Sequence, residues 1–234
     1  MAYTKQKIAL ITGGNRGIGF AIAQGLISAG WQVIIGARSI EKGKAAVEKL
    51  NSDSASTVVI DVADDNSIQQ AAQQLSKEIP HLNVLINNAG IYPDKGGSIL
   101  TIDRDLLTKT LSTNTFSQVL TTQAFLPLLK QAQSAKIINY SSGYGQLAGL
   151  SAGAPSYCLS KLGVNGVTIM LAEALSNTNI AVCAVDPGWV SSDMGGSSAP
   201  RTLEQGADTA VWLAEQETLK ENGRLWRDRT IVSF

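Results

Sequence analysis

The stretch Thr12-Gly13-Gly14-Asn15-Arg16-Gly17-Ile18-Gly19 lies between an apolar run at 7–12 and a helical pattern at 17–30. Glycines let the backbone turn sharply and approach a pyrophosphate, whose charge the N-terminus of the following helix can meet. The spacing Gly-x-x-x-Gly-x-Gly differs from the commoner Gly-x-Gly-x-x-Gly. A purely structural connector also uses glycines. The position after a first strand favours a dinucleotide-binding turn, with contacts from Gly13, Asn15, Arg16, Gly17, Ile18 and Gly19.

Short β-branched runs alternate with longer helical patterns along the whole chain. We predict strands at 7–12, 32–37, 57–60, 82–87, 136–141 and 180–185, and helices at 17–30, 40–51, 64–79, 103–131 (with room for a break), 156–175 and 203–215. The tail from Gly223 can add an edge strand. Because parallel neighbours need a crossover connection, strict alternation implies a parallel sheet. The predicted fold is α/β, a Rossmann-like doubly wound parallel sheet of about seven strands in a single domain over 1–234.

The ligand of such a sheet is expected outside the carboxyl ends of its strands. The segments that leave those ends contain most of the unusual polar residues and glycines. They are 13–19, 37–38, 61–62, 88–90, 142–145 and 186–192.

The composition excludes several classes of protein. Hydrophobic residues make up 44% of the 234 residues, and the 19 basic and 19 acidic residues give a formal net charge of +0. No basic stripe stands out, so nucleic acid is not an expected partner. No apolar run approaches the ~20 residues that cross a bilayer. The N-terminus runs directly into a predicted strand without a leader, and we expect a cytoplasmic protein.

Neither the cysteines nor the histidine indicate a metal site or a disulfide. Cys158 and Cys183 lie in apolar segments, where cysteine is usually a small buried side chain. His81, the only histidine, follows Pro80 in a predicted turn. A metal site normally needs several such ligands, so none is expected.

The end of the second predicted strand indicates the cofactor. An acidic residue there would accept hydrogen bonds from the adenosine ribose, whereas an arginine can bind a 2′-phosphate. The chain has Gly36-Ala37-Arg38-Ser39 and no acid at this point, with Arg16 as a second cation nearby. Both arginines could instead be solvated surface residues. The pattern favours NADP(H), with Arg38 as the main contact.

Tyr157 and Lys161 lie at positions i and i+4 of a predicted helix that carries few other charges. A free tyrosine has a pKa of about 10, too high for efficient proton transfer at neutral pH. A lysine one turn away favours the phenolate, so we expect the pKa of Tyr157 to be lowered. The Tyr-x-x-x-Lys spacing alone is weak evidence for a catalytic pair, because it recurs by chance on many helices.

Six features now stand in the order found in the short-chain dehydrogenases/reductases, which the chain resembles from about residue 5 to residue 194. They are the turn at 12–19, Asn87-Asn88-Ala89-Gly90, Asn114, Ser142, the Tyr157/Lys161 pair and Pro187-Gly188. The glycine turn, the ending Gly223-Arg224-Leu225-Trp226-Arg227-Asp228 and Arg38 resemble the carbonyl-reductase branch. Monomeric animal carbonyl reductases carry a long insertion between the serine and the tyrosine, which this chain lacks.

The resemblance implies a role for each matched residue. Ser142 would stabilise the substrate oxygen, Tyr157 would deliver its proton, and Lys161 would hold the nicotinamide ribose. Asn114 would anchor a water of the proton relay. Ser141 could compete with Ser142, but the spacing from Asn139 favours Ser142. The further implied cofactor contacts are Asp61, Val62, Asn88, Ala89, Gly90, Pro187, Gly188, Val190 and Ser192.

The expected function is NADPH-dependent reduction of a ketone or aldehyde to an alcohol. A 3-oxoacyl-thioester reductase is the nearest alternative, and a non-catalytic NADP-sensing regulator is an alternative of another class. The expected partner is a small carbonyl or alcohol substrate in a fairly apolar pocket. The candidate lining residues are Ile91, Tyr92, Tyr144, Leu147, Trp189 and Met194.

Two of the predicted helices lack a charged outer face. Residues 111–129 contain no charged side chain, and 157–175 contain only Lys161 and Glu173. A helix packed on one side of a sheet normally shows charges to solvent. We therefore expect a homodimer or homotetramer.

Overall fold

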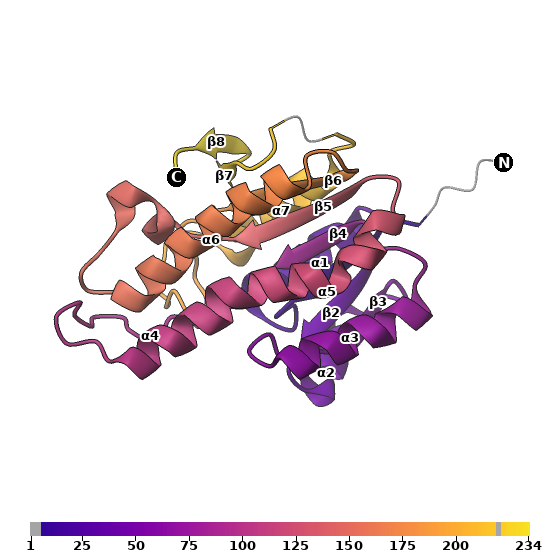
Figure 1. Cartoon of the computed structure of the whole chain (residues 1–234). Coiled ribbons are helices and arrows are strands. Elements are labelled where there is room, and N and C mark those ends of the chain that lie inside the picture. Colours follow the sequence, from indigo (N-terminus) through magenta and orange to yellow (C-terminus); the bar gives the residue numbers. More distant parts are fainter. Residues whose placement is uncertain (1–5, 219–220) are drawn as a thin grey trace.

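An eight-stranded sheet runs through the middle of the molecule (Figure 1). The computed structural model describes residues 6–218 and 221–234. The strands are β1 Ile8–Thr12, β2 Gln32–Ala37, β3 Ala55–Val59, β4 Val84–Asn87, β5 Ala135–Tyr140, β6 Ile180–Val185, β7 Leu225–Arg227 and β8 Thr230–Val232. Their order is β3-β2-β1-β4-β5-β6-β7-β8. All neighbours are parallel except β7 and β8, which are antiparallel.

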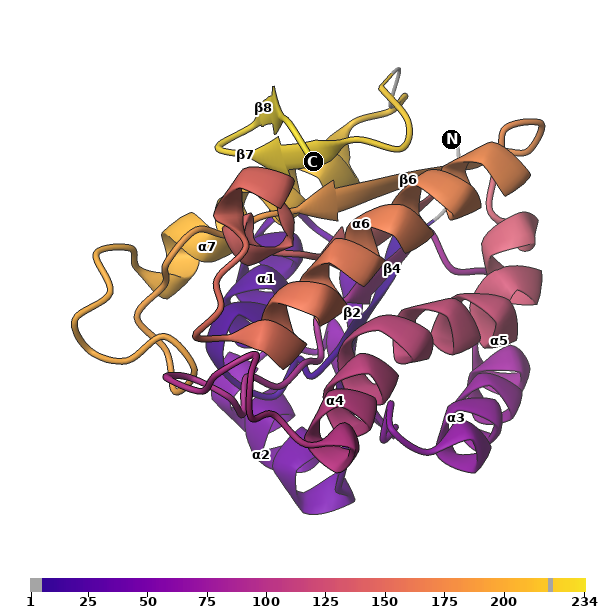
Figure 2. The same ribbon diagram turned by 60° about the vertical axis from the view of Figure 1, so that its left-hand side comes forward.

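Helices cover both faces of the sheet. They are α1 Gly17–Ser28, α2 Ile40–Leu50, α3 Asp65–Glu78, α4 Arg104–Leu111, α5 Ser117–Gln131, α6 Pro155–Ala174 and α7 Leu203–Glu215. The side chains of α3, α5 and α6 share one apolar core, and those of α1, α2 and α7 share the other. Figures 1 and 2 show α3, α5 and α6 together on one side of the sheet. The α/β doubly wound fold is confirmed.

The side chains of β1 alternate between the two faces of the sheet and are apolar on both. Helices must therefore pack on both faces. Ile8 and Leu10 belong to one core, whereas Ala9 and Ile11 belong to the other. All four are almost fully buried. A strand that is apolar on both sides is stable only in the centre of a layered sheet, and this is where β1 lies.

The long helix predicted over 103–131 is interrupted, as the sequence allowed. A π-helical turn, η1 Ser112–Phe116, separates α4 from α5. Such turns insert an extra residue into a helix and occur frequently at functional sites. The third strand lies at Ala55–Val59 instead of 57–60.

The C-terminal tail forms a hairpin, which raises the number of strands from about seven to eight. β7 pairs with β6, and β8 pairs back onto β7. The turn between them places Asp228 and Arg229 at φ values of 50° and 61°. Two ion pairs hold this turn, Arg201 with Asp228 and Arg229 with Asp208.

Three further expectations concern features away from the sheet ends. Residues 1–5, where the sequence predicts no leader, lie outside the described residues. Among the described helices, none combines the length and the apolar character needed to span a membrane. Cys158 and Cys183 are both buried as free thiols.

Candidate active site

The strand order reverses between β1 and β4. From β1 the chain proceeds outward through β2 and β3, whereas from β4 it proceeds the other way through β5 and β6. Loops that leave β1 and β4 therefore diverge. In doubly wound sheets this switch point is where ligands bind.

The glycine turn after β1 has the shape of a phosphate cradle. Gly13 and Gly17 have φ values of 65° and 55°, which side chains rarely adopt. A Cβ atom on Gly19 would lie 2.6 Å from the Gly13 carbonyl oxygen. The first turn of α1 has no side-chain cap and no acidic residue. Its N–H groups are therefore left for an anion, which fits a dinucleotide pyrophosphate.

Thr12 and Asn88 join this turn to the loop after β4. The Thr12 hydroxyl accepts hydrogen bonds from the backbone N–H groups of Asn88 and Ala89, at 3.0 and 3.1 Å. The Asn88 side-chain amide donates to the carbonyl oxygens of Thr12 and Gly13, at 3.0 and 3.3 Å. Asn88 was expected to contact the cofactor, and in the structure its side chain holds the two loops together.

The two candidate phosphate-binding arginines differ in their surroundings. Arg38 is exposed at the end of β2 and makes no ion pair among the described residues. Arg16 is also exposed, but its guanidinium pairs with the carboxylate of Asp193. Arg38 therefore keeps its donors available for a phosphate, whereas Arg16 already has a partner.

Asn114 is fully buried in the π-helical turn η1. Its amide donates to the Ile91 carbonyl oxygen at 2.8 Å and to the Ser160 hydroxyl at 2.9 Å. Its side-chain oxygen accepts from the Ile91 N–H at 2.8 Å. Asn114 thus ties η1 to the loop after β4 and to α6.

The structure distinguishes the two candidate serines after β5. Ser141 is buried, and its hydroxyl donates to the Asn165 side chain at 2.6 Å. Ser142 is half-buried, and its hydroxyl accepts a hydrogen bond from the Tyr144 N–H at 3.2 Å. The Ser142 hydroxyl proton is therefore left to point toward the Tyr157 oxygen or toward a ligand.

Tyr157 and Lys161 lie one turn apart on α6 and are both buried, at 7% and 4% exposure. The Nζ atom of Lys161 lies 5.6 Å from the centre of the Tyr157 ring. It donates a hydrogen bond to the Tyr140 carbonyl oxygen at 2.6 Å. Burial lowers the pKa of Lys161 to about 8, and the Asp186 carboxylate opposes this fall. The ammonium is charged below that pH and neutral above it.

The pKa of Tyr157 shifts in the direction opposite to our expectation. Burial raises it, a hydrogen bond with Ser142 opposes the rise, and the negative charge of Asp186 adds to it. The physical reason is that the enclosed site disfavours a phenolate by more than its hydrogen bond restores. In this arrangement Tyr157 is a protonated phenol at neutral pH.

Three tyrosines form an aromatic group at the mouth of the site. Tyr92 stacks on Tyr157 with ring centres 4.3 Å apart, and Tyr144 meets both rings edge-on at 6.2 Å. The Met194 sulfur lies 3.9 Å from the Tyr157 hydroxyl. Trp189 and Leu147 are exposed, at 53% and 69%. Tyr92, Tyr144 and Met194 are thus brought together at Tyr157, whereas no described contact joins Leu147 to it.

The other predicted cofactor contacts lie in the loops that follow β3, β4 and β6. Asp61 is half-buried and accepts a hydrogen bond from the Ala63 N–H at 3.0 Å. A Cβ on Gly90 would lie 3.2 Å from the Asn114 side-chain oxygen and 3.8 Å from Lys161 Nζ. Ser192 accepts a hydrogen bond from the Gly195 N–H at 3.1 Å. The other expected cofactor contacts in these loops are buried or half-buried, namely Val62, Ala89, Pro187, Gly188 and Val190.

Three acidic or basic residues near the site were missed by the sequence analysis. Asp94 is buried, and its carboxylate accepts from the Ser156 N–H at 2.6 Å, at the start of α6. Asp186 is buried at the end of β6 and pairs with Arg227 from β7. Only Asp186 left a signal in the sequence, because its carboxylate directly follows an apolar strand.

Comparisons with known proteins agree with this geometry. The short chain dehydrogenase family matches residues 7–203. Short-chain dehydrogenase anuI of Penicillium roqueforti is 34% identical over 253 residues, covering 100% of this chain and 99% of the relative. Carbonyl reductase (NADPH) 3 of Mus musculus is 31% identical over 281 residues, covering 97% and 98%. The 3-oxoacyl-(acyl-carrier-protein) reductase FabG of Haemophilus influenzae is 33% identical over 188 residues, covering 80% and 76%.

Solved structures show the same likeness over nearly the whole chain. Carbonyl reductase Sniffer of D. melanogaster superposes with a TM-score of 0.90 at 32% identity, covering 98% of this chain and 100% of that one. The NADPH-bound carbonyl reductase from chicken fatty liver has a TM-score of 0.89 at 29% identity, covering 98% and 99%. The chain therefore belongs to the short-chain dehydrogenase/reductase family of oxidoreductases, on its carbonyl-reductase-like branch.

Proposed function

We propose that this protein uses NADPH to reduce the carbonyl group of a ketone or aldehyde to an alcohol. One observation carries the proposal most strongly: Ser142, Tyr157 and Lys161 meet in a buried site beside the glycine turn. Relatives whose names include NADPH-dependent carbonyl reductases support the same reaction.

The proton chemistry follows from the positions of three side chains. When bound, NADPH supplies a hydride to the carbonyl carbon. Ser142 donates a hydrogen bond to the carbonyl oxygen, where negative charge develops. Tyr157 gives its phenolic proton to that oxygen, which completes the alcohol. Burial raises the pKa of Tyr157, so the phenol keeps its proton at neutral pH and can donate it.

Lys161 and Asn114 assist the proton transfer from Tyr157 without contacting the substrate oxygen themselves. The Lys161 ammonium would hold the nicotinamide ribose and stabilise the phenolate that remains after proton transfer. The Asn114 amide is held by three hydrogen bonds, so its side chain fixes η1. A relay water would then bind a backbone carbonyl oxygen of the widened turn.

The preference for NADPH rests on Arg38. Its guanidinium is exposed at the end of β2, with no acidic residue within Gly36-Ala37-Arg38-Ser39. Arginine offers a planar set of donors that suits a phosphate. The 2′-phosphate of NADPH supplies that partner, and NADH has none.

A 3-oxoacyl-thioester reductase is the second candidate, because FabG proteins are among the relatives. That reaction uses the same three side chains on a carrier-bound substrate. The apolar aromatic mouth formed by Tyr92 and Tyr144 favours a free hydrophobic carbonyl compound over a carrier arm. A non-catalytic NADP-sensing regulator would not need the Tyr157 and Lys161 pair.

A substrate panel tests the proposal. The purified protein is given NADPH or NADH with aldehydes, ketones, diketones or 3-oxoacyl esters, and oxidation of the cofactor is followed by absorbance. We expect turnover with NADPH on hydrophobic ketones or aldehydes. Preferential turnover of 3-oxoacyl esters would support the second candidate. Tight NADPH binding with no turnover on any compound would support the regulator.

We also propose that the protein is a homodimer or homotetramer. Leu159, Ile169 and Met170 are 42%, 47% and 60% exposed along the outer side of α6. Apolar side chains in such a row usually contact a partner. Light scattering at micromolar concentration should give a multiple of the chain mass, and Met170→Lys should reduce it. A monomeric mass for the unaltered protein contradicts the proposal. The single domain over 1–234 and the cytoplasmic location stay predictions.

A further inference from the structure

Asp186 is a buried carboxylate that the proposed chemistry does not use. Only 2% of the residue is exposed. One carboxylate oxygen accepts a hydrogen bond from the Gly188 N–H at 2.9 Å, and the other pairs with the Arg227 guanidinium. The Arg227 side chain is 38% exposed, so Asp186 is the buried member of this pair. Burying a carboxylate is costly unless it is paired and hydrogen-bonded. A role beyond anchoring the hairpin is therefore worth testing.

Two other ion pairs hold the β7–β8 hairpin, and their carboxylates lose less hydration than that of Asp186. Arg201 pairs with Asp228 at 2.5 Å, and Arg229 pairs with Asp208 at 2.5 Å. The side chains of Asp228 and Asp208 are 57% and 42% exposed, so these carboxylates remain partly hydrated. The side chain of Asp186 is only 1% exposed. Asp186 is thus the one buried carboxylate of the three pairs, and it lies beside the loop that carries Ser142.

The side chains of Asp186 and Arg227 pack against the loop that carries Ser142. A Cβ atom built on Gly143 would lie 3.0 Å from an Arg227 guanidinium nitrogen and 3.3 Å from an Asp186 carboxylate oxygen. Two residues further on, a Cβ on Gly145 would lie 2.7 Å from the backbone of Lys161. The side-chain amide of Gln146 donates to the Ser233 carbonyl oxygen at 2.6 Å. The loop is therefore enclosed between the C-terminal hairpin and α6.

Asp186 also lies near the site of Lys161. The Lys161 ammonium donates to the Tyr140 carbonyl oxygen, and Tyr140 pairs with Val185, the residue before Asp186. The titratable groups described there are Tyr157 on the same helix, Asp186 after β6 and Arg227 on β7, with Tyr92 stacked on Tyr157. The elements on the other side present neutral groups, namely Asn114 in η1 and the Tyr140 carbonyl. Burial lowers the pKa of Lys161 to about 8, and Asp186 is the group that opposes this fall.

We propose that Asp186 and Arg227 form a positioning pair: Arg227 holds the Ser142 loop in place, and Asp186 keeps Lys161 charged in its buried site. The proposal rests on the proposed function. It brings the C-terminal hairpin, which lies beyond the matched family region, into the active site.

Charge-changing variants separate this role from simple anchoring. Asp186→Asn keeps the shape and the Gly188 hydrogen bond but removes the negative charge. Arg227→Met removes the positive charge and leaves Asp186 unbalanced. A nearby opposite charge shifts a pKa by about one unit or more. We therefore expect the alkaline limb of the kcat/KM profile to move by about one unit to lower pH in Asp186→Asn, and to higher pH in Arg227→Met.

A direct titration of Lys161 provides a readout that does not depend on activity. Lysine side chains labelled with 13C are followed by NMR against pH in the protein without cofactor, with Lys161→Met to assign the signal. The Lys161 pKa should fall in Asp186→Asn and rise in Arg227→Met. Arg229→Met is the matched control, because it removes an exposed ion pair of the same hairpin. It should move neither the NMR titration nor the pH profile.

Each outcome decides between the two roles. Shifts in opposite directions support the positioning pair, and an unchanged Lys161 titration or shifts in the same direction overturn it. If Arg227→Met does not fold, Asp186→Asn decides alone by the same titration. If the unaltered protein reduces no carbonyl compound, the proposed function fails, while the titration still shows whether Asp186 controls the charge of Lys161.

Discussion

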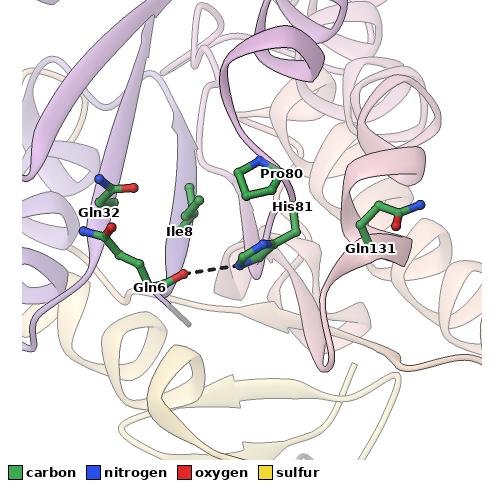
Figure 3. A pocket seen from close by; sticks show the side chains of 6 residues that line it. All are labelled: Gln6, Ile8, Gln32, Pro80, His81 and Gln131. Atoms are coloured by element: carbon green, nitrogen blue, oxygen red, sulfur yellow. Dashed lines mark hydrogen bonds between the residues drawn. The ribbon is translucent and has the colours of Figure 1, made fainter. Parts of the chain in front are cut away.

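The two ends of the sheet hold different kinds of polar residue. At the carboxyl ends lie Ser142, Tyr157, Lys161 and the buried Asp186, which pairs with Arg227. At the amino ends a cavity of about 400 Å³ is lined by Gln6, Ile8, Gln32, Pro80, His81 and Gln131 (Figure 3). None of the candidate catalytic residues lines this cavity, so its size does not identify it as a functional site.

The chemistry of the lining explains the difference. His81 is buried, and its Nε2 atom lies 3.2 Å from the Gln6 carbonyl oxygen, so the ring is held by the backbone (Figure 3). The remaining lining residues carry amide or apolar side chains. At the carboxyl ends, by contrast, the buried Lys161 and Asp186 lie near the Ser142 hydroxyl. This difference supports the proposal that the carboxyl ends carry the reaction and that the amino ends serve the fold.

The largest expected effect comes from removing the proposed proton donor. Tyr157→Phe keeps the ring that stacks on Tyr92 but removes the hydroxyl. We expect kcat/KM to fall by ~10²–10⁴, the usual contribution of general acid–base catalysis, with NADPH binding retained. Steady-state kinetics and a fluorescence titration with NADPH measure the two quantities.

Tyr140→Phe is the matched control for this variant. Tyr140 is equally buried, but its hydroxyl donates to the Gly206 carbonyl oxygen at 3.1 Å on the other face of the sheet. It should lose about 1 kcal/mol of the free energy of unfolding and keep its turnover. Near-normal turnover of Tyr157→Phe would contradict the proposed chemistry.

The next effect concerns the cofactor and should be confined to NADPH. Arg38→Leu removes the exposed guanidinium at the end of β2. Hydrogen bonds to charged groups contribute about 1.5–3 kcal/mol, so kcat/KM with NADPH should fall roughly 10- to 100-fold. NADH should be used as before, because it has no 2′-phosphate. Both cofactors are measured at one ionic strength, with Arg104→Leu as an exposed control on α4.

An equal loss with both cofactors would show that Arg38 supports the fold. The preference for NADPH would then have to rest on Arg16. That residue would first have to leave Asp193, with which it is paired.

The sequence predicted the features that depend on neighbouring residues in the chain. The alternation of strands and helices, the glycine turn and the Tyr157/Lys161 spacing are local patterns, and the structure shows each of them. The sequence left room for a break within 103–131 without placing it, and the structure has it at η1. The choice of Ser142 over Ser141 stays a prediction, and the hydrogen bond from the Ser141 hydroxyl to Asn165 supports it.

Features that depend on tertiary packing were not predictable in this way. Arg227 and Asp186 are 41 residues apart, and only the pairing of β7 with β6 brings them together. The direction of the Tyr157 pKa shift was wrong for the same reason. Spacing shows that a lysine is near, but it does not show how far burial against Tyr92 excludes water from the phenol.

The smallest effect on activity is expected at the amino ends of the strands. His81→Ala removes a buried ring and its hydrogen bond to Gln6, so the free energy of unfolding should fall by about 1–3 kcal/mol. Because the sheet separates this cavity from Tyr157, kcat/KM should stay within about twofold with either cofactor. Urea unfolding and steady-state kinetics measure the two quantities. Gln131→Ala, an exposed residue of the same cavity, should change stability by no more than about 0.5 kcal/mol. A loss of turnover in His81→Ala without a loss of stability would mean that the amino ends take part in the reaction, and the contrast between the two ends would have to be abandoned.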